Sequence, residues 1–549
     1  MKLFNGLHFN NLKGDFTGGL AAAVVALPLA IAFGVFSGAG PMSGIIAAVF
    51  VGFFASLTGS TASQISGPTG PMTVLMMLIF MQYTTVDPLH GIAISFTVVM
   101  LGGVFLILFG VFKISQYINM IPHSVISGLM SGLGLTIILL QLGPLLGHAS
   151  ADSLWQSILQ LPGAIAHPAT ETAIIGILAL VLMYLQPKSI GKYIPSPLTT
   201  LLIGTTSYLL LFPDSMIKTI GETAINLPLP QWPVVNTDLL LDMLKSALAL
   251  AILGTIDTLM TSLVADNISR DRHDSDRELI GQGIANIASG AFSGIAGAGA
   301  SMRTVINVRH GGQTALSGIF HSLIVLLLVL LFGQFIELVP HAVLAAILIK
   351  VASDLVDWDY MKRLHKAPKP AIIIMFSVLL LTLFVDLMIA IGTGITLASL
   401  MFMKRMSDLQ LEKTSTITHP EDEHPLSSAE SQYLQQAQGR ILLFHVSGPM
   451  SFGAAKSMVK RVSSVDNYEA LVLDLSDVPI IDFSSSVAIE DIILDAQEAG
   501  HHIFICGASE SIKQTLSRQG IIELLLQDHQ YESRLDALKH ASDLLNQAQ

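Results

Sequence analysis

The chain of 549 residues is too apolar to be a water-soluble protein. Apolar residues make up 52% and charged residues 12% of the sequence, and the mean hydropathy is +0.64. Ordinary soluble domains carry about 25% charged residues, roughly twice as many. This composition excludes a soluble enzyme and a disordered scaffold.

Charge is divided unevenly along the chain. Residues 1–410 hold 19 Lys and Arg against 20 Asp and Glu, whereas residues 411–549 hold 9 against 20. A nearly neutral apolar block is therefore followed by an acidic tail, which argues against nucleic acid or anionic lipid as a partner. The single cysteine, Cys506, excludes intramolecular disulfides and metal sites built from several cysteines.

The apolar block contains about fourteen segments that are candidates for crossing a membrane. The first seven lie at 16–36, 42–58, 68–82, 89–113, 118–147, 172–187 and 196–212. The second seven lie at 242–266, 278–295, 299–309, 314–335, 339–352, 369–385 and 387–403. The stretch before Phe16 has neither an apolar core nor a cleavage site, so we expect the first segment to be retained as a crossing.

Basic residues orient this trace. Most Lys and Arg of the apolar block fall on one side, and only Lys218 and Lys245 fall near the other. Because basic loops stay in the cytoplasm, we expect a multi-pass protein of the inner membrane with both termini and the acidic tail in the cytoplasm.

Short sequence matches indicate that the apolar block is an internal duplication. Three pairs of segments match in the same order, at offsets of 218, 238 and 231 residues: Ile121–Ile126 with Val339–Leu344, Gly52–Gly59 with Gly290–Gly297, and Thr73-Val74 with Thr304-Val305. Since each copy holds seven segments, an odd number, the second copy is inverted in the membrane. Inverted repeats are typical of secondary transporters, and here we expect them over about 15–212 and 241–405.

The tail follows a different pattern. Residues 406–438 are polar and are expected to be a linker between a membrane domain, 1–405, and a soluble domain, 439–549. The soluble domain alternates expected strands with expected helices, at 441–446, 470–475, 484–499, 502–506, 512–519 and 534–547. This alternation predicts a small α/β sheet covered by helices.

Two Gly-rich stretches precede the short segments and indicate a binding site. Ser66–Pro71 precedes the first and Gly297–Ser301 precedes the second. Irregular backbone at membrane depth must line a protein cavity, because bare backbone groups are not tolerated in hydrocarbon. Two half-helices that begin there would direct their N–H groups at an anion. The alternative is that both are loops whose glycines allow close helix packing.

Asp257 is the one ionisable residue in the apolar span 247–265. An unpaired carboxylate in such a span costs several kcal/mol, so it is functional by default. Thr261 lies four residues on, on the same helix face, and the two side chains offer hard oxygens suited to a small hard cation. The alternative is a protonated Asp257 in a helix–helix hydrogen bond.

Two further positions have open roles. Arg303 is the only base of the segment 299–309 before its last residue, and it is expected to attract an anion, to pair with Asp257 or to reach the cytoplasmic surface. In the tail, Asp474–Ser485 predicts a buried strand, a turn and a helix start. Either Asp482 and Ser484 only cap that helix, or Ser484 is a phosphorylatable or partner-facing residue. No ATP-binding or paired-Cys metal motif is present in the sequence, which predicts no cofactor.

These motifs together resemble the SulP family of anion transporters, also called solute carrier family 26, over nearly the whole chain. The most specific segments are Gly67–Val74, Ile256-Asp257, Thr261-Ser262, Val264–Asp266, Gly297–Ala300 and Leu475–Pro479. The resemblance implies an α-helical membrane protein with about fourteen transmembrane segments in a 7+7 inverted repeat. Segments 1–4 and 8–11 would form a core domain that moves against a gate domain of segments 5–7 and 12–14. The tail would be an α/β STAS domain, related to anti-sigma-factor antagonists, in a homodimer.

Within the family the chain is most similar to the sodium-dependent bicarbonate branch. This similarity implies an anion site between Thr69-Gly70 and Ala300-Ser301. It implies a sodium site made by Asp257, Thr261, Gly299 and Ser301, with sodium as the coupling ion. It also points to Ser484 as a regulatory serine through which the STAS domain would meet a cytoplasmic regulator.

The leading expectation is a sodium-coupled bicarbonate symporter that works by alternating access and is not an enzyme. The alternative is a proton-coupled or exchange-type permease for sulfate or another small anion. Two departures bear on this choice. Pro28-Leu29 stands where many members carry a Gln or Glu after the proline, which weakens the proton-coupled alternative. Arg303 matches the wider family better than the bicarbonate branch, which leaves the anion open.

Overall fold

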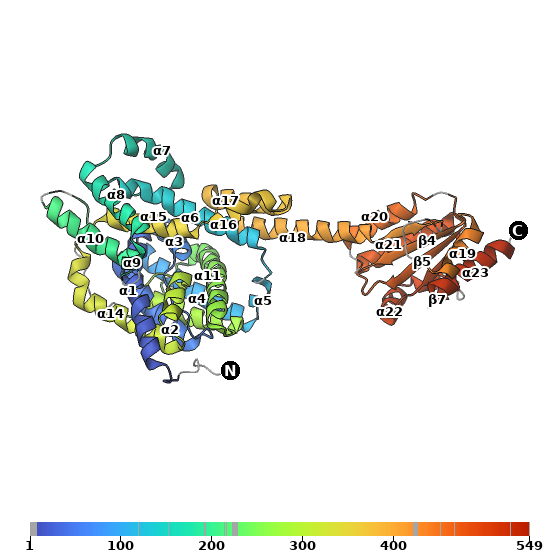
Figure 1. Cartoon of the computed structure of the whole chain (residues 1–549), viewed down its shortest axis with the longest axis horizontal. Helices are drawn as coiled ribbons and strands as arrows, with labels where there is room; N and C mark the ends of the chain where they lie inside the picture. Colours follow the sequence, from blue (N-terminus) through green and yellow to red (C-terminus); the bar gives the residue numbers. More distant parts are fainter. Residues whose placement is uncertain are drawn as a thin grey trace. The chain divides into compact units, whose positions relative to one another are not determined.

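The computed structural model describes residues 8–547, apart from 119, 152, 192–193, 214, 216, 222–228, 420, 422–425, 449, 451, 466 and 527–528. The chain forms two compact units, Met1–Thr396 and Leu397–Gln549. Figure 1 shows the first as a bundle of helices and the second as a sheet with helices against it.

Each of the fourteen expected segments coincides with a helix in the described part of the chain. In the first repeat these are α1 (Leu12–Phe36), α2 (Pro41–Thr58), α3 (Gly70–Val86), α4 (Gly91–Val111), α6 (His123–Leu145), α8 (Thr170–Leu185) and α10 (Ser196–Leu211). In the second they are α11 (Leu240–Ser269), α12 (Ser275–Ala291), α13 (Ser301–Arg309), α14 (Ala315–Ile336), α15 (His341–Leu355), α17 (Lys369–Phe384) and α18 (Leu387–Glu412).

These helices differ in whether they are long and apolar enough to cross a membrane. Among the described residues seven pass by length and composition, or eight if α7 and α8 count as one bent span. Helices α3, α10 and α17 are apolar but shorter. Helices α12 and α13 carry buried polar side chains, among them Glu278, Gln282 and Arg303. Their polarity fits elements enclosed by protein rather than exposed to lipid.

Helix α7 (Leu154–Ala166) lies between two expected segments, where the sequence analysis predicts no helix. Ser153 caps its start by accepting a hydrogen bond from the backbone of Gln156. It is bent by 107° from α8 and leaves Trp155 and Leu159 exposed. At 13 residues it is too short to span a bilayer, so its outward apolar face fits a helix that lies at the membrane surface.

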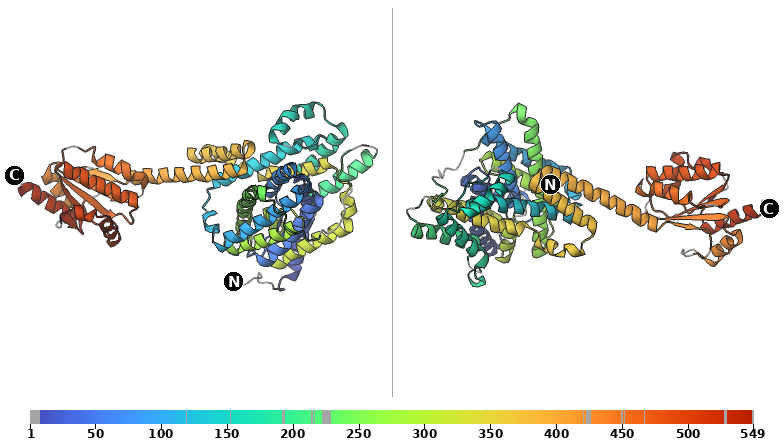
Figure 2. Two further views of the ribbon diagram at one scale, coloured as in Figure 1. Left: turned by 180° about the vertical axis from the view of Figure 1, so that it is seen from behind. Right: turned by 90° about the horizontal axis from the view of Figure 1, so that it is seen from above.

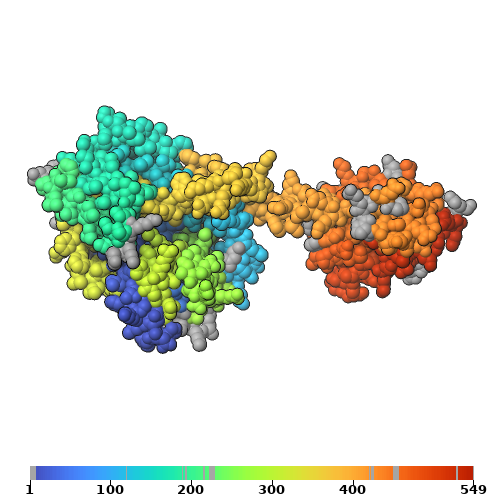
Figure 3. All heavy atoms as spheres, in the orientation of Figure 1, coloured from blue at the N-terminus to red at the C-terminus, as the bar shows by residue number. Residues whose placement is uncertain are grey.

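Equivalent helices of the two repeats make equivalent packing contacts. Helix α1 packs against α13 and α14, and its counterpart α11 packs against α3 and α4. Helix α2 packs on α14 as α12 packs on α4, and α6 packs on α17 as α15 packs on α8. Figure 2 shows the blue helices of the first repeat beside the green and yellow helices of the second, and Figure 3 shows their atoms adjoining on one face. Helices α1–α4 and α11–α14 thus form one cluster, which meets α6, α10 and α15.

Two short strands pack within this cluster, β1 against α2 and β2 against α11. Strands β1 (Ser66–Gly67) and β2 (Ala298–Gly299) pair antiparallel, with Gly67 opposite Ala298 and Ser66 opposite Gly299. Gly67 and Ala298 are 231 residues apart, the offset that also relates Thr73 to Thr304. Equivalent strands that pair antiparallel are related by a local two-fold axis, as an inverted repeat requires.

The second unit is a five-stranded sheet in the order β3-β4-β5-β6-β7, parallel except for the β3–β4 pair. Its strands are β3 (Ser415–Ile417), β4 (Ile441–Ser447), β5 (Ala470–Asp477), β6 (His502–Cys506) and β7 (Gln530–Tyr531). Its helices are α19 (Ser428–Ala437), α20 (Phe452–Val462), α21 (Phe483–Glu498), α22 (Glu510–Arg518) and α23 (Arg534–Gln547). Apolar side chains fill a core on each face of the sheet.

The expected linker, 406–438, differs from the structure. Helix α18 continues to Glu412, and the domain begins well before residue 439. Strand β3 adds an edge to the sheet and buries Ile417, while α19 packs Leu434 against α23. The capping box of Ser427 and Glu430 starts α19. A three-residue strand and one apolar side chain per turn are too little periodicity to be recognised without their partners.

A buried ion-pair network ties this segment to the sheet. Arg534 donates to both carboxylate oxygens of Glu430, at 2.7 and 3.1 Å, and to Asp474 at 3.3 Å. His445 lies 2.8 Å from Asp474 through Nδ1. Burial by itself raises the pKa of Asp474, but hydrogen bonds with His445 and Ser476 outweigh it and lower that pKa to about 2. Burial raises the pKa of the Cys506 thiol, so this cysteine is a core residue rather than a reactive one.

We therefore predict that a fragment over 413–549 is more stable than one over 439–549. The shorter fragment loses the burial of Ile417 and Leu434 and leaves Arg534 without Glu430, a loss of about 3 kcal/mol or more. Urea unfolding of the two fragments, followed by circular dichroism, measures the difference. Equal midpoints would contradict the assignment of β3 and α19 to this domain.

Candidate ion and anion site

Half-helices α3 and α13 begin directly after the crossing strands. Their N-caps are Thr69 and Ala300, and in this described region neither makes a side-chain hydrogen bond to its own helix. The strand pair is extended by a bond from the backbone N–H of Ala300 to Ile65. The first N–H groups of both helices therefore have no side-chain cap, and the positive ends of both dipoles lie near the β1–β2 crossing.

Asp257 contacts the first half-helix. Thr69 donates a hydrogen bond from Oγ1 to Oδ2 of Asp257 at 2.6 Å, across 188 residues of sequence. Asp257 is half-buried in the middle of α11, and Thr69 is 8% exposed. The cation residue and the anion residue named from the sequence are thus direct neighbours.

A second group of oxygens lies one turn further along α11. Thr261 Oγ1 is 3.1 Å from the carbonyl oxygen of Gly299 and 2.7 Å from Ser301 Oγ. Thr258 accepts a hydrogen bond from the backbone N–H of Gly299 at 3.2 Å and so helps to fix β2 against α11. A carbonyl and two hydroxyls converge beside the Asp257 turn, and all are hard oxygen donors.

Arg303 lies beside the crossing, against Gly67 and Pro68. It is 2% exposed, so it does not reach the surface, and Nη2 donates to the carbonyl oxygen of Pro68 at 2.5 Å. Its charge lies near enough to Asp257 to interact electrostatically, but no ion pair joins the two in the described structure. Its Nη1 is buried without a hydrogen-bond partner, beside Gly67. Arg303 therefore ties α13 to the start of α3 and leaves one positive donor facing the crossing.

Several polar residues around the crossing were missed by the sequence analysis. Glu278 and Gln282 on α12 and Asn286 one turn on are buried, and the last two hydrogen-bond the carbonyl oxygen of Gly297. Glu278 stood at the first residue of an expected span, where an acid normally marks a boundary. Its position in a Ser-Asp-Arg-Glu start was the one available signal, because its partners lie more than 200 residues away.

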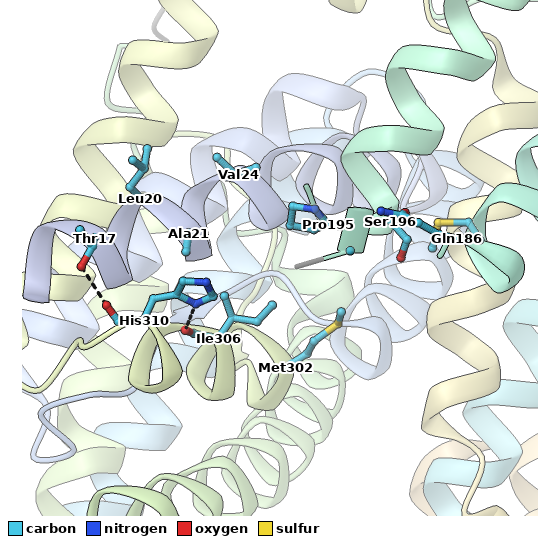
Figure 4. A pocket seen from close by; sticks show the side chains of 12 residues that line it. Thr17, Leu20, Ala21, Val24, Gln186, Pro195, Ser196, Met302, Ile306 and His310 are labelled. Atoms are coloured by element: carbon cyan, nitrogen blue, oxygen red, sulfur yellow. Dashed lines mark hydrogen bonds between the residues drawn. The ribbon is translucent and has the colours of Figure 1, made fainter. Parts of the chain in front are cut away.

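A cavity of about 830 Å³ runs along α13. Figure 4 shows Thr17 and Leu20 from α1, Met302 from α13 and His310 directly after α13 on one side, with Ser196 from α10 opposite. Met302 lies in the first turn of α13, so the cavity reaches the neighbourhood of Ser301. A second cavity, of about 300 Å³, is lined by later turns of α3 and by α6 and α15.

In the second unit Asp482 is the N-cap of α21 and accepts a hydrogen bond from the backbone of Ser485 at 2.8 Å. Capping thus falls to Asp482, and Ser484 is exposed in the first turn. The side chains of Ile480 and Phe483 beside it are also exposed.

Comparison with known proteins decides the family. The model of the sulfate permease family matches residues 12–378, and the model of the STAS domain matches residues 433–537. The chain belongs to the sulfate permease (SulP) family. It is a membrane transporter rather than an enzyme, with a C-terminal STAS domain.

Individual relatives cover nearly the whole chain. The chain is 42% identical to the bicarbonate transporter BicA of Synechocystis sp., over 98% of this chain and 96% of the relative. It is 30% identical to a putative sulfate transporter, YvdB, of Bacillus subtilis, over 96% of this chain and 98% of the relative.

Solved structures agree with the fold. The transmembrane domain of a cyanobacterial BicA matches 71% of this chain and all of that chain, with a TM-score of 0.68 and 42% identity. The murine solute carrier 26 family member A9 matches 98% of this chain and 92% of that chain, with a TM-score of 0.82 and 19% identity. The expected helical transporter fold with a 7+7 repeat and an α/β tail is confirmed.

The glycines of the crossing differ in the room around them. A Cβ on Gly299 would lie 2.8 Å from Gln64 Nε2 and 2.9 Å from Thr261 Cβ, both held in place. A Cβ on Gly70 would meet only the end of the flexible Leu355 side chain at 2.8 Å. We predict that Gly299→Ala lowers the melting temperature of the purified protein by several degrees, whereas Gly70→Ala does not. Equal melting temperatures for the two variants would contradict the geometry of the crossing.

Proposed function

We propose that this transporter is a sodium-coupled bicarbonate symporter of the inner membrane. One observation carries the proposal: the carboxylate of Asp257 contacts the N-cap of one half-helix beside the oxygens that Thr261 gathers from the other. A site for a small cation and a site for a small anion would then share α11 and the two half-helix ends.

Sodium fits the donors present. Asp257, the hydroxyls of Thr261 and Ser301 and the carbonyl of Gly299 would hold it, since all four offer hard oxygen and one carries negative charge. The described residues contain no cluster of three His, Cys, Asp or Glu side chains, the kind of set that holds a transition metal. The bound cation would offset the repulsion between Asp257 and an anion, so that each ligand raises the affinity of the other.

The anion would bind between Thr69-Gly70 and Ala300-Ser301, at the positive ends of both half-helices. Bicarbonate is favoured because both BicA relatives, at 42% and 41% identity, are bicarbonate transporters by name. The second candidate is sulfate, supported by Arg303 and by the Bacillus relative. A dianion calls for more positive charge than one arginine held beside the crossing supplies.

Transport would proceed by alternating access. The cluster of α1–α4 and α11–α14 would move as the core against the gate helices, opening in turn the cavity along α13 and the cavity along α3. The loop charges support cytoplasmic termini. The protein would act as a homodimer, and exposed Ser484 would be where a cytoplasmic regulator acts on the STAS domain.

Uptake into proteoliposomes tests the ion and the anion together. We expect labelled bicarbonate to enter when sodium is outside and to stop entering when choline replaces sodium at fixed pH. Labelled sulfate should not enter. If bicarbonate uptake is the same in choline as in sodium but rises on acidification, Asp257 is a proton carrier and the sodium proposal is wrong.

Variants of α11 should separate charge from affinity. Asp257→Asn keeps the shape and the contact with Thr69 but removes the negative charge, so sodium-driven uptake should fall to the level of empty liposomes while the protein still folds. Thr261→Ala removes one ligand and should raise the half-saturating sodium concentration about tenfold or more. Normal sodium dependence in Asp257→Asn would exclude this site.

Bulk at the half-helix ends tests the anion site. If backbone N–H groups provide most of the binding, Thr69→Ala should weaken uptake only a few-fold, by about 1 kcal/mol. Ala300→Leu should abolish uptake, because its side chain would fill the space between the two N-caps. The measurement is bicarbonate uptake normalised to protein recovered from gel filtration, and full transport by Ala300→Leu would exclude this location.

A further inference from the structure

Glu278 is a buried carboxylate with a role that the proposed site leaves unassigned. It lies in the first turn of α12 and is 1% exposed. Its Oε2 accepts hydrogen bonds from the backbone N–H groups of Ser60 and Thr61 at 2.7 and 2.8 Å, and its Oε1 accepts one from Gln64 Nε2 at 2.9 Å. With its oxygens engaged by these donors, Glu278 is poorly placed to bind an ion itself, and its effect must pass through the groups it holds.

The carboxylate fixes the orientation of the Gln64 amide. An ionised carboxylate only accepts hydrogen bonds, so the NH₂ end of Gln64 must face Glu278 and the carbonyl end must face away. That carbonyl end, Oε1, accepts a hydrogen bond from Ser262 at 2.9 Å. Ser262 is fully buried on α11, next to Thr261, and its Oγ is also 3.0 Å from Thr61 Oγ1. The network therefore connects α12, the segment before β1 and the ion-binding turn of α11.

Gln64 also contacts β2 directly. A Cβ on Gly299 would fall 2.8 Å from Gln64 Nε2 and 2.9 Å from Thr261 Cβ, so Gly299 is enclosed between these two side chains. The same Nε2 also lies 3.3 Å from the Oγ of Ser66, and Ser66 pairs with Gly299 across the strands. A change in the position of the Gln64 amide would thus shift the Gly299 carbonyl against Thr261.

We propose that Glu278 is a positioning residue for the sodium site, acting through Gln64 on Ser262 and on the Gly299 carbonyl. This inference rests on the proposed sodium coupling. Glu278 does not touch the ion. It sets the distance between two of the ion's oxygen donors, as outer partners of metal ligands commonly do.

Three variants at two positions test the chain of contacts. In Glu278→Gln the amide must keep its oxygen toward Ser60 and Thr61, so its NH₂ meets the NH₂ of Gln64 and forces that amide to turn. Gln64→Glu alone sets two carboxylates against each other. The double variant Glu278→Gln with Gln64→Glu restores a donor facing an acceptor and still offers an oxygen to Ser262.

The measurements are the half-saturating sodium concentration for bicarbonate uptake and the sodium-induced rise in melting temperature of the purified protein. We expect Glu278→Gln to raise the half-saturating sodium concentration about tenfold, and the exchange to bring it back to within about threefold of the wild type. The half-saturating bicarbonate concentration at saturating sodium should stay unchanged in Glu278→Gln.

Asp15 provides a matched control. It is a fully buried carboxylate that accepts hydrogen bonds from the backbone N–H groups of Gln313 and Thr314 and from the Thr314 hydroxyl, away from α11 and β2. Asp15→Asn should lower the melting temperature without sodium, as Glu278→Gln does, and leave the half-saturating sodium concentration as in the wild type.

The outcomes separate this inference from the function on which it rests. If bicarbonate uptake by the wild type does not depend on sodium, the symporter proposal is overturned. With a sodium-dependent wild type, an unchanged half-saturating sodium concentration in Glu278→Gln overturns the positioning role alone. An equal increase in Asp15→Asn, or no recovery in the exchange, assigns the effect to general destabilisation and also overturns it.

Discussion

The crossing of β1 and β2 is the constraint on which the membrane unit depends. Two segments leave the helical pattern deep in an apolar unit, and their backbone groups need partners there. The strands satisfy each other in part through their antiparallel pairing. Side chains supply the rest: Thr258 and Asn286 serve the second strand segment, and Arg303 serves the first. The polar residues of α11, α12 and α13 are explained by this demand before any ligand is considered.

The two halves of the crossing satisfy this demand differently. The first half is held by one charged donor, Arg303, and by Thr69 through Asp257. The second half is held by neutral hydroxyls and amides, from Thr258, Thr261 and Asn286. A duplicated unit has thus diverged into a half held by one charged group of each sign and a half held by neutral groups. A symmetric pair of half-helices would attract anions alone, whereas this asymmetry leaves room for a cation beside the anion.

The elements with strong local patterns were predictable from the sequence. Apolar length located the fourteen helices of the repeats, and Gly and Pro located the two half-helix starts. Asp257 stood out because nothing near it in sequence compensates its charge. Other elements were not predictable. The amphipathic α7 carries too few apolar residues to be recognised as a span. Strand β3 depends on a distant partner, because it becomes a strand only by pairing with β4. Glu278 resembled a helix boundary in the sequence, because the N–H groups that donate hydrogen bonds to it lie far away, before the first half-helix.

The burial of Glu278 shows how close packing and site geometry are joined. Gly59 and Gly281 bring the end of α2 against α12, where a Cβ on Gly281 would lie 2.5 Å from Gly59. The turn after α2 leads into buried Thr61, so its N–H groups need an acceptor from the protein. Glu278 satisfies them at the N-terminal end of α12, where a helix dipole also favours a negative charge. The same carboxylate orients Gln64, so the contact that closes the packing of α2 on α12 also determines which end of an amide faces the ion-binding turn of α11.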